Sequence, residues 1–232
     1  MRLKILSWNI WMHGNHKEVS KFLEHSRADI VALQEVIVAH ETIELAKHFT
    51  EHLGYQHVFA ESFEDVIDGF QVKIGNAVFS KYPIVNSKIH HLSKVKNRVA
   101  LQTDIEIGDS ILHVFNTHLL HTHQQPSKLQ DVQATHLRKV LTPHKTVLMG
   151  DFNALPNSNA INIVSRVLTN TDKNMLPTWS IYPKGCEHCS PKGLLYKLDN
   201  IFVSPDVTYS NFLVEESKAS DHLPVSVTIE IQ

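Results

Sequence analysis

The chain has 232 residues, of which 42% are hydrophobic, and its formal net charge at pH 7 is −2. This length and apolar content are sufficient for a single globular domain over residues 1–232, and they exclude a disordered or low-complexity chain. The small net charge argues against a protein that coats nucleic acid, because such proteins carry a large basic excess.

The N-terminal sequence MRLKILSWNIW contains two basic residues and a short apolar run. Ser7 and Asn9 interrupt this run, so that it is too short and too polar for a secretory signal peptide. No stretch of 18 apolar residues occurs in the sequence, which predicts that no segment spans a membrane. We therefore expect a cytoplasmic protein, and we expect it to be a monomer.

In the first half of the chain, apolar periodicity predicts helices between strands and then a run of consecutive strands. The helices are expected at Lys17–Ser26 and Thr42–Leu53, and an irregular acidic loop is expected to run to Gly69. The strands are expected at Leu3–Ile10, Ile30–Leu33, Tyr55–Ala60, Asn76–Ser80, Val85–Leu92, Val99–Ile107 and Ile111–His118.

In the second half, helices and strands alternate again. Helices are expected at Pro126–Leu141 and Asn159–Leu168. Strands are expected at Thr146–Gly150, Leu198–Ser204, Phe212–Glu215 and Val225–Ile231. Helices at both ends with hairpin-like strands between them favour an α/β fold in which two stacked sheets carry helices on the outside.

The charge is distributed unevenly along the chain. The segment 70–103 contains no acidic residue but holds six basic ones: Lys73, Lys81, Lys88, Lys94, Lys96 and Arg98. Such a segment either meets an anionic substrate or forms a solvated sheet edge protected by lysines, and the sequence leaves both interpretations open.

Cys186 and Cys189 lie in the sequence GCEHCSPKG, together with His188. A single C-x-x-C without a second pair of ligands is a weak indication of a metal or redox site. Two ordinary thiols in a surface loop are the favoured interpretation.

The stretch Thr146–Pro156 is the most informative part of the chain. An apolar run of β-type residues ends at Gly150, and Asp151 and Asn153 follow at once. Residues two apart on an extended backbone point to the same side, so a carboxylate and an amide can converge on one ligand. Gly, Asp and Asn also form ordinary turns, and this stretch alone does not separate the two interpretations.

Polar residues of catalytic type recur at the ends of other predicted strands, and this favours a site. The set contains carboxylates, amides and imidazoles but no cysteine, and such oxygen-rich ligands favour Mg²⁺ or Mn²⁺ over zinc. Its members are Asn9, Glu35, His118, Asp151, Asn153, Asp199, Asp221 and His222.

Around these residues the chain resembles the endonuclease/exonuclease/phosphatase superfamily, which includes deoxyribonuclease I. The segments SWNI, ALQEV, NTHL, GDFN, LDNIFVS and SDHLPV resemble its motifs and occur in the expected order from Ile5 to Ile229. The resemblance implies a four-layer α/β/β/α sandwich of two stacked mixed, largely antiparallel sheets with helices outside. It also implies a divalent-metal-dependent phosphoric ester hydrolase of the compact bacterial type.

The resemblance further implies a role for each motif residue. Glu35 would be the principal metal ligand with Asn9 beside it, and Asp221 would be a further carboxylate on the metal side. Asp151 would orient or deprotonate the attacking water, and Asn153 would hold a phosphoryl oxygen.

The remaining implied roles belong to the imidazoles and their partner. His222 would contact the scissile phosphate, and Asp199 would fix its tautomer. His118 would stabilise charge on the phosphoryl oxygens or protonate the leaving group.

Two residues outside these motifs are also candidates for substrate contact. Arg98, in KNRVALQT, is a candidate phosphate contact or one partner of a surface salt bridge. Trp179 either stacks on a base or packs within its loop, and packing is the favoured interpretation.

Three functions remain possible from the sequence. The leading hypothesis is a Mg²⁺- or Mn²⁺-dependent phosphodiesterase that acts on nucleic acid. The alternative is a phosphoesterase for a lipid headgroup or a small phosphorylated metabolite. A non-catalytic binding module on the same scaffold is the weakest hypothesis, because no motif residue is missing.

Overall fold

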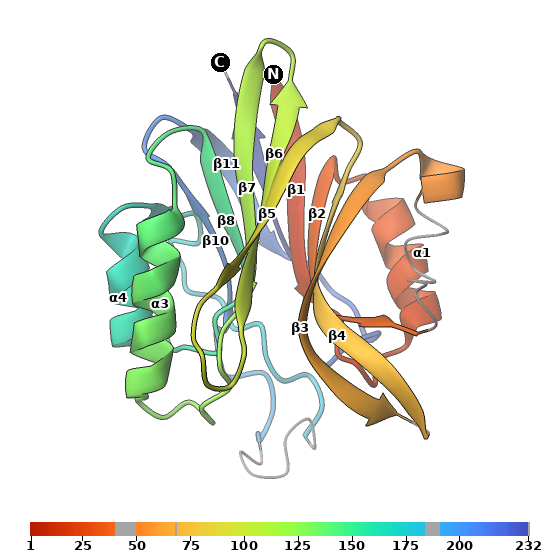
Figure 1. Cartoon of the computed structure of the whole chain (residues 1–232), viewed down its shortest axis with the longest axis vertical. Helices are drawn as coiled ribbons and strands as arrows, with labels where there is room; N and C mark the ends of the chain where they lie inside the picture. Colours follow the sequence, from red (N-terminus) through yellow and green to blue (C-terminus); the bar gives the residue numbers. More distant parts are fainter. Residues whose placement is uncertain (40–49, 68, 184–190, 232) are drawn as a thin grey trace.

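The computed structural model describes residues 1–39, 50–67, 69–183 and 191–231. Two six-stranded sheets stack face to face, and helices cover their outer faces (Figure 1). This arrangement confirms the predicted α/β sandwich of two mixed sheets. Among the described helices, none has both the length and the apolar content needed to cross a membrane.

The first sheet has the strand order β11-β12-β1-β2-β4-β3. Only β1 and β2 are parallel neighbours, and all other pairs in this sheet are antiparallel. Its strands are β1 (Arg2–Asn9), β2 (Ile30–Val38), β3 (Gln56–Ile67), β4 (Phe70–Ser80), β11 (Thr208–Val214) and β12 (Val225–Glu230).

The second sheet has the order β5-β6-β7-β8-β10-β9. Here β7 and β8 are the parallel pair, and the other pairs are antiparallel. Its strands are β5 (Ile84–His91), β6 (Val99–Ile107), β7 (Ser110–His118), β8 (Thr146–Asp151), β9 (Thr169–Asn170) and β10 (Asp199–Val203).

The helices lie on the outer faces of the sheets because each buries one apolar stripe. Helix α1 (His16–Ser26) is capped by the Asn15 side chain and packs Val19 and Leu23 onto the first sheet. Helices α3 (Lys128–Val140) and α4 (Asn159–Ser165) cover the second sheet. Of the helix expected at Thr42–Leu53, residues 50–53 are helical, and the rest lies outside the described residues.

The expected acidic loop between Ala60 and Gly69 was wrong. Strand β3 continues to Ile67 and pairs with β4 along its whole length, so that β4 also begins six residues earlier than expected. The polar residues that suggested a loop instead project from an edge ribbon, where Glu61 forms an ion pair with Lys73 at 3.2 Å. An edge strand with one solvated face carries charge without losing its hydrogen-bonded ladder.

Smaller differences occur where the apolar pattern is weak. Strand β11 begins at Thr208 rather than Phe212, helix α4 ends at Ser165 rather than Leu168, and the two-residue strand β9 was not expected. All three differences fall at the ends or outer edges of elements, where sequence pattern specifies boundaries least well.

A layer of buried amides joins the two sheets near one end of the sandwich. Asn116 on β7 donates to the carbonyl oxygens of Leu33 (2.8 Å) and Ala77 (2.9 Å) on the facing sheet. Its own Oδ1 accepts a hydrogen bond from Gln34 Nε2 at 2.7 Å. Elsewhere the space between the sheets is filled by aliphatic side chains such as Ile5 and Val114. The hydrogen bonds of these side-chain amides therefore link the two sheets directly, whereas the aliphatic side chains elsewhere only pack against one another.

Replacing Asn116 with alanine tests this layer. The substitution leaves two buried carbonyls and the Gln34 amide short of a partner, which we expect to cost about 2–4 kcal/mol of unfolding free energy. Thermal denaturation should show a fall in Tm of roughly 5–15 °C for a domain of this size. The control Asn86→Ala removes an exposed amide that donates to Asp104, and it should lower Tm far less. Equal stability of the Asn116 variant and wild type would show that the amide layer contributes nothing.

Candidate active site

Three neighbouring strands of the second sheet place catalytic-type side chains in one row. His118 of β7 lies opposite Asp151 of β8 in the parallel ladder, and Asp199 of β10 lies opposite Asp151 in the antiparallel ladder. All three residues continue the inward-facing positions of their strands, which are occupied further along by Val114, Met149 and other core residues. The sheet register therefore brings two carboxylates and an imidazole to the same edge of the sandwich interior.

Gly150 allows the close approach of β7 and β8 at this point. A Cβ atom at position 150 would lie 1.9 Å from the backbone oxygen of Thr117, and the φ angle of 149° is one that side chains rarely adopt. Only glycine fits here, since the clash is with backbone rather than with a movable side chain. The glycine directly before Asp151 thus holds this carboxylate beside His118.

A β-bulge directs Glu35 toward the site. The register between β2 and β4 shifts between Leu33 and Val36, and Glu35 has a positive φ of 58°. Without the bulge, regular alternation would place Glu35 on the outer face, where Leu33 and Val36 pack against α1. The bulge instead leaves Gln34 in the amide layer and brings the Glu35 carboxylate to the end of the sandwich, where it accepts a hydrogen bond from the backbone N–H of Met12 at 2.9 Å.

Asn9 connects carboxylates from the two sheets. Its Nδ2 donates to Glu35 Oε1 and to Asp151 Oδ2, both at 3.0 Å. Its Oδ1 accepts from the backbone N–H of Trp11, which fixes the orientation of the amide. Asn9 therefore meets the carboxylates with its N–H₂ group, and its oxygen faces away from them.

His222 is held by contacts on both sides of its ring. Its Nδ1 lies 2.8 Å from Asp199 Oδ2, and its Nε2 lies 3.7 Å from Asp151 Oδ2. Its backbone oxygen accepts from Trp8 Nε1, and its backbone N–H donates to Ser220 Oγ. The hydrogen bond between Nδ1 and Asp199 fixes the orientation of the ring and directs Nε2 toward Asp151.

Asp221 accepts a hydrogen bond from Trp179, a residue whose role the sequence left open. Trp179 Nε1 donates to Asp221 Oδ2 at 2.8 Å, and the indole is almost fully buried. The backbone of Trp179 also forms bridges with Tyr196 and His222. Packing within the loop is therefore the correct interpretation of this residue, and it additionally orients a carboxylate.

His121 is a member of the site that sequence reasoning missed. The Asn153 amide nitrogen donates to Leu119 O (3.2 Å) and faces His118 Nε2 (3.0 Å), while its oxygen lies 2.7 Å from His121 Nδ1. Because a carbonyl only accepts, Leu119 fixes the amide orientation, and His121 Nδ1 must then carry the proton. The signal in the sequence was the repeated histidine pattern of HTHLLHTH, which continues beyond the recognised NTHL motif.

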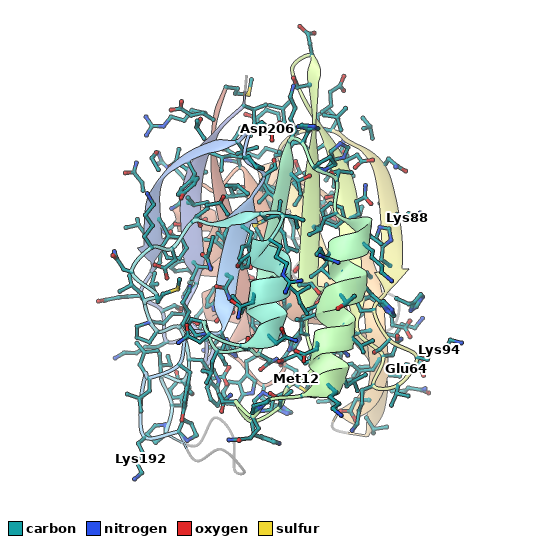
Figure 2. The ribbon with its side chains drawn as sticks, turned by 90° about the vertical axis from the view of Figure 1, so that its left-hand side faces the viewer. Met12, Glu64, Lys88, Lys94, Lys192 and Asp206 are labelled. Carbon is teal, nitrogen blue, oxygen red and sulfur yellow. The ribbon has the colours of Figure 1, made fainter. Side chains whose placement is uncertain are left out.

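These groups surround one open cavity of about 270 Å³. Met12, which lines it, lies in the lower part of the molecule in Figure 2, and Asp206 lies in the upper part. Asp199 does not line the cavity, and it lies against His222, which does. Every other residue expected at the site except Asn9 contributes to its wall: Glu35, Arg98, His118, Asp151, Asn153, Asp221 and His222.

Of the basic segment 70–103, Arg98 alone lines this cavity. Its buried Nη1 has no hydrogen-bond partner among the described residues, and the guanidinium lies over the Phe63 ring at 5.6 Å. Lys73 pairs with Glu61, and Lys81 pairs with Asp29 at 3.2 Å. Lys88 and Lys94 are exposed on the β5 side (Figure 2). The segment therefore contributes one cation to the site and distributes the others over the surface.

Comparison with known proteins identifies the family. The sequence profile of the Endonuclease/Exonuclease/phosphatase family matches residues 6–222, which is nearly the whole chain. The chain belongs to this family. No curated protein matches its sequence significantly.

Solved structures of family proteins share the fold at low sequence identity. An endonuclease/exonuclease/phosphatase from Beutenbergia cavernae is 18% identical, with a TM-score of 0.78 over 99% of this chain and 72% of that one. The human Nocturnin catalytic domain is 18% identical, with a TM-score of 0.73 over 99% and 94%. A mannosyl-6-phosphatase from Bacteroides thetaiotaomicron is 17% identical, with a TM-score of 0.72 over 99% and 100%. The chain thus has the phosphoesterase fold of this family.

The electrostatics of the site follow from crowded, buried carboxylates. Burial raises the pKa of Asp151 to about 7, although the positive charge of His222 opposes this and the nearby Asp199 adds to it. Burial also raises the pKa of Asp221, and the neighbouring charge of Glu35 contributes to the increase. The site therefore holds more negative charge than its own side chains compensate.

The two central imidazoles differ in charge. Burial alone would lower the pKa of His222, but the carboxylates of Asp199, Asp151 and Asp221 outweigh it and raise that pKa well above 6.5. Burial lowers the pKa of His118 well below 6.5, and the positive charges of Arg98 and His222 act in the same direction. At neutral pH the site thus contains one imidazolium, His222, and one neutral imidazole, His118.

The carboxylate oxygens and imidazole nitrogens of this site fit a hard divalent cation. Asp151, Asp199 and His222 offer ligand atoms within 4.8 Å of one another, but His222 Nδ1 and Asp199 Oδ2 are already hydrogen-bonded to each other. Asp199 Oδ1, however, is buried without a partner, and the Glu35 carboxylate faces the cavity beside Asp221. Excess negative charge and carboxylate oxygens are the environment that Mg²⁺ or Mn²⁺ prefers.

These pKa shifts predict an unusual pH dependence of stability in the metal-free protein. A group whose pKa is higher in the folded protein than in the unfolded chain stabilises the fold at pH values below its unfolded-state pKa. This stabilisation is lost as the pH rises through the folded-state pKa. Asp151 therefore loses its contribution between pH 3.8 and about 7, and His222 loses its contribution above pH 6.5. The lowered pKa of His118 has the opposite effect and adds stability as pH rises toward 6.5. We therefore expect Tm in the presence of EDTA to fall as pH rises from 6.5 to 8.5, measured by calorimetry.

The exposed-surface control for this experiment is Asp65→Asn, since Asp65 lies on the edge ribbon away from these carboxylates. It should keep the wild-type slope of Tm against pH. Mg²⁺ should flatten the slope in both proteins, because a bound cation compensates the carboxylates. A metal-free Tm that rises steadily with pH over this range would contradict the assigned protonation states.

Proposed function

We propose that the chain is a divalent-metal-dependent phosphodiesterase that hydrolyses a phosphate ester by in-line attack of water, with nucleic acid as the leading substrate class. The observation that carries the proposal is the convergence of Glu35, Asp151, Asp221 and two imidazoles on one cavity in a phosphoesterase fold. Hydrolysis of a phosphate ester needs a positioned water and dispersal of negative charge over the phosphoryl oxygens, and this cavity offers groups for both.

Glu35 and Asp221 are the residues we assign to hold Mg²⁺ or Mn²⁺. Their carboxylates reach the cavity, while Asn9 presents its N–H₂ group to Glu35 and therefore serves as a positioning group in this arrangement. When bound, the cation polarises the phosphoryl oxygen and neutralises part of its charge.

Asp151 is the residue that we assign as proton acceptor for the attacking water. With its pKa near 7, the carboxylate accepts a proton at neutral pH more readily than an ordinary aspartate. Its Oδ1 is held by the backbone N–H of Asn153 at 2.8 Å, so that its Oδ2 is the oxygen that faces the imidazoles.

The remaining groups stabilise the phosphoryl oxygens. The His222 imidazolium, held by Asp199, supplies positive charge and a proton at Nε2. The Arg98 guanidinium has a buried N–H without a partner, and a phosphate oxygen is a matching acceptor. His118, being neutral, is suited to hydrogen bonding rather than to protonating the leaving group, and Asn153 completes this wall.

A phosphoesterase for a small phosphorylated metabolite or a lipid headgroup is the second candidate. The basic segment favours it, because Lys73 and Lys81 pair with acids and none of the lysines of this segment lines the cavity. The mannosyl-6-phosphatase among the structural neighbours shows that the fold is also found in a protein named for a phosphorylated sugar.

Three substitutions test the assignment of catalytic roles. Asp151→Asn and His222→Ala should each lower kcat with bis-p-nitrophenyl phosphate by about 100- to 1000-fold, since each removes one group that acts on the transition state. Asp199→Asn should lower kcat less and should shift the acid and alkaline limbs of the pH–rate profile, because it acts through His222. Lys88→Ala, exposed on β5, serves as the control and should leave kcat unchanged. Undiminished kcat in Asp151→Asn with the fold intact would overturn the proton-acceptor assignment.

Metal binding is tested without any substrate. Saturating Mg²⁺ or Mn²⁺ should raise the wild-type Tm by mass action, by about 2.7 kcal/mol of unfolding free energy at a concentration 100 times Kd. Glu35→Gln should lose most of this increase, while Glu64→Gln, on the edge ribbon at the right of Figure 2, should keep it. An equal increase in both variants would exclude Glu35 as a ligand.

The substrate class is decided by parallel assays. Single- and double-stranded DNA, RNA, bis-p-nitrophenyl phosphate, p-nitrophenyl phosphate and sphingomyelin are incubated with Mg²⁺ or Mn²⁺, with EDTA and with the Asp151→Asn protein as controls. Cleavage of a nucleic acid that both controls abolish supports the leading proposal. Turnover restricted to the small esters or to the lipid supports the second candidate instead.

A further inference from the structure

A second cavity adjoins the catalytic one. It has a volume of about 340 Å³ and lies between the loop that joins β7 to α3 and the loop that joins β8 to α4. Asn153 lines both cavities, so the two lie on either side of this residue. A substrate with its phosphate beside Asn153 can therefore extend its non-phosphate part into this second space, which we term the amide cavity.

The walls of the amide cavity are fixed by Gln130 from the first turns of α3. Its Nε2 donates to Leu120 O (2.9 Å) in one loop and to Phe152 O (3.2 Å) and Asn153 O (2.9 Å) in the other. The Gln130 side chain is 3% exposed and thus forms a buried link between both loops and the helix. Helices α3 and α4 themselves pack side by side on the second sheet (Figure 2). The two loops that line the cavity are therefore held in place by hydrogen bonds to helix α3.

Most of the residues that line the amide cavity are polar and uncharged, although apolar atoms contribute most of its exposed surface. Its side chains are mainly amides and hydroxyls, among them Gln124, Gln125, Asn157 and Ser127, and Asp131 is its one acid. Among the described residues that line it there is no lysine or arginine. A second phosphate or another anion would thus meet no compensating charge, whereas amides and a carboxylate are suitable partners for hydroxyl groups.

One donor in this wall lacks a partner. The Nε2 atom of Gln124 is buried and makes no hydrogen bond in the described structure. Buried polar groups are nearly always satisfied, and leaving one unpaired costs free energy. Because Gln124 lines the amide cavity, a rotation of its side chain brings this donor to an acceptor on a ligand there.

Resting on the proposed phosphoesterase function, we propose that the amide cavity binds the neutral, hydroxyl-bearing group of the substrate, that is, a sugar ring attached to the phosphate. Gln124 donates to a ring or hydroxyl oxygen, and Asp131 accepts from a hydroxyl. A volume of about 340 Å³ lies at the lower end of the range for small-molecule sites and accommodates one such ring. The sugar comes either from a nucleotide or from a phosphorylated monosaccharide, and both present the same hydroxyl chemistry.

The test measures binding rather than turnover. Isothermal titration calorimetry with Mg²⁺ is performed in the Asp151→Asn background, so that the probes are not hydrolysed. The probes are inorganic phosphate, ribose 5-phosphate, thymidine 5′-monophosphate and mannose 6-phosphate. At least one sugar-bearing probe should bind about tenfold more tightly than inorganic phosphate, because it gains two or more hydrogen bonds in the amide cavity.

Two variants remove this advantage by different means. Gln124→Ala deletes the unpaired donor, and Asn157→Trp fills the cavity from an exposed position without disturbing a buried side chain. Each should weaken the sugar-bearing probe about fivefold or more and leave inorganic phosphate unchanged. Lys128→Ala, exposed at the start of α3 and outside the cavity wall, is the matched control and should change neither.

The outcomes separate this inference from the proposed function. Tighter binding of ribose 5-phosphate and thymidine 5′-monophosphate alone identifies the nucleotide source, and tighter binding of mannose 6-phosphate identifies the monosaccharide source. If no sugar-bearing probe exceeds inorganic phosphate, or if the advantage persists in both variants, the inference is overturned. The proposed function is judged separately by metal-dependent hydrolysis of bis-p-nitrophenyl phosphate in the wild-type protein.

Discussion

The structure depends on the polar side chains that occupy one end of the space between its two sheets. For most of its length this space is filled by aliphatic side chains, but at one end the inward-facing positions carry amides and carboxylates. Asn116 and Gln34 link the sheets there, and Asn9 joins Glu35 of one sheet to Asp151 of the other. Buried polar groups specify a geometry only when their hydrogen bonds are made, and these bonds fix the separation of the sheets at the site.

The same polar end creates an electrostatic imbalance. Asp151, Asp199 and Asp221 are buried within one region. His222, Arg98 and Lys197 bring positive charge to it, although Lys197 also pairs with Asp172. Burying charge without compensation is costly, so two of the carboxylates have raised pKa values and one imidazole stays protonated. Strain in the backbone accompanies this imbalance, since Glu35 and Asn153 both have positive φ angles. Backbone conformations of this kind occur most often at functional sites.

Much of this organisation was predictable from the sequence because strand periodicity determines which residues face inward. Asp151, Asp199 and His118 continue the apolar alternation of their own strands, so that their convergence follows from strand register alone. The stacked mixed sheets and their outer helices followed from the same periodicity, together with the recognised motifs.

What the sequence did not reveal depends on contacts between distant segments. The end of β3 lacks alternation because consecutive residues on both of its faces, Glu64, Asp65 and Val66, are exposed, and its acidic residues therefore resembled a loop. The roles of His121 and Gln130 come from hydrogen bonds to Asn153, 32 and 23 residues away, which no local pattern encodes. The orientation of the Asn9 amide likewise depends on the Trp11 backbone, so that its N–H₂ group rather than its oxygen meets the carboxylates.

The proposed cation site is formed by these crowded carboxylates. Titration of Mn²⁺ into the metal-free protein at pH 6.5, followed by calorimetry in two buffers with different ionisation enthalpies, tests it. Because the pKa of Asp151 is about 7 and that of Asp221 is raised, binding should displace protons, and the apparent enthalpy should differ between the buffers. Saturable binding accompanied by proton release, and abolished by Glu35→Gln, is the predicted result. Absence of binding, or binding with the same enthalpy in both buffers, would contradict the account.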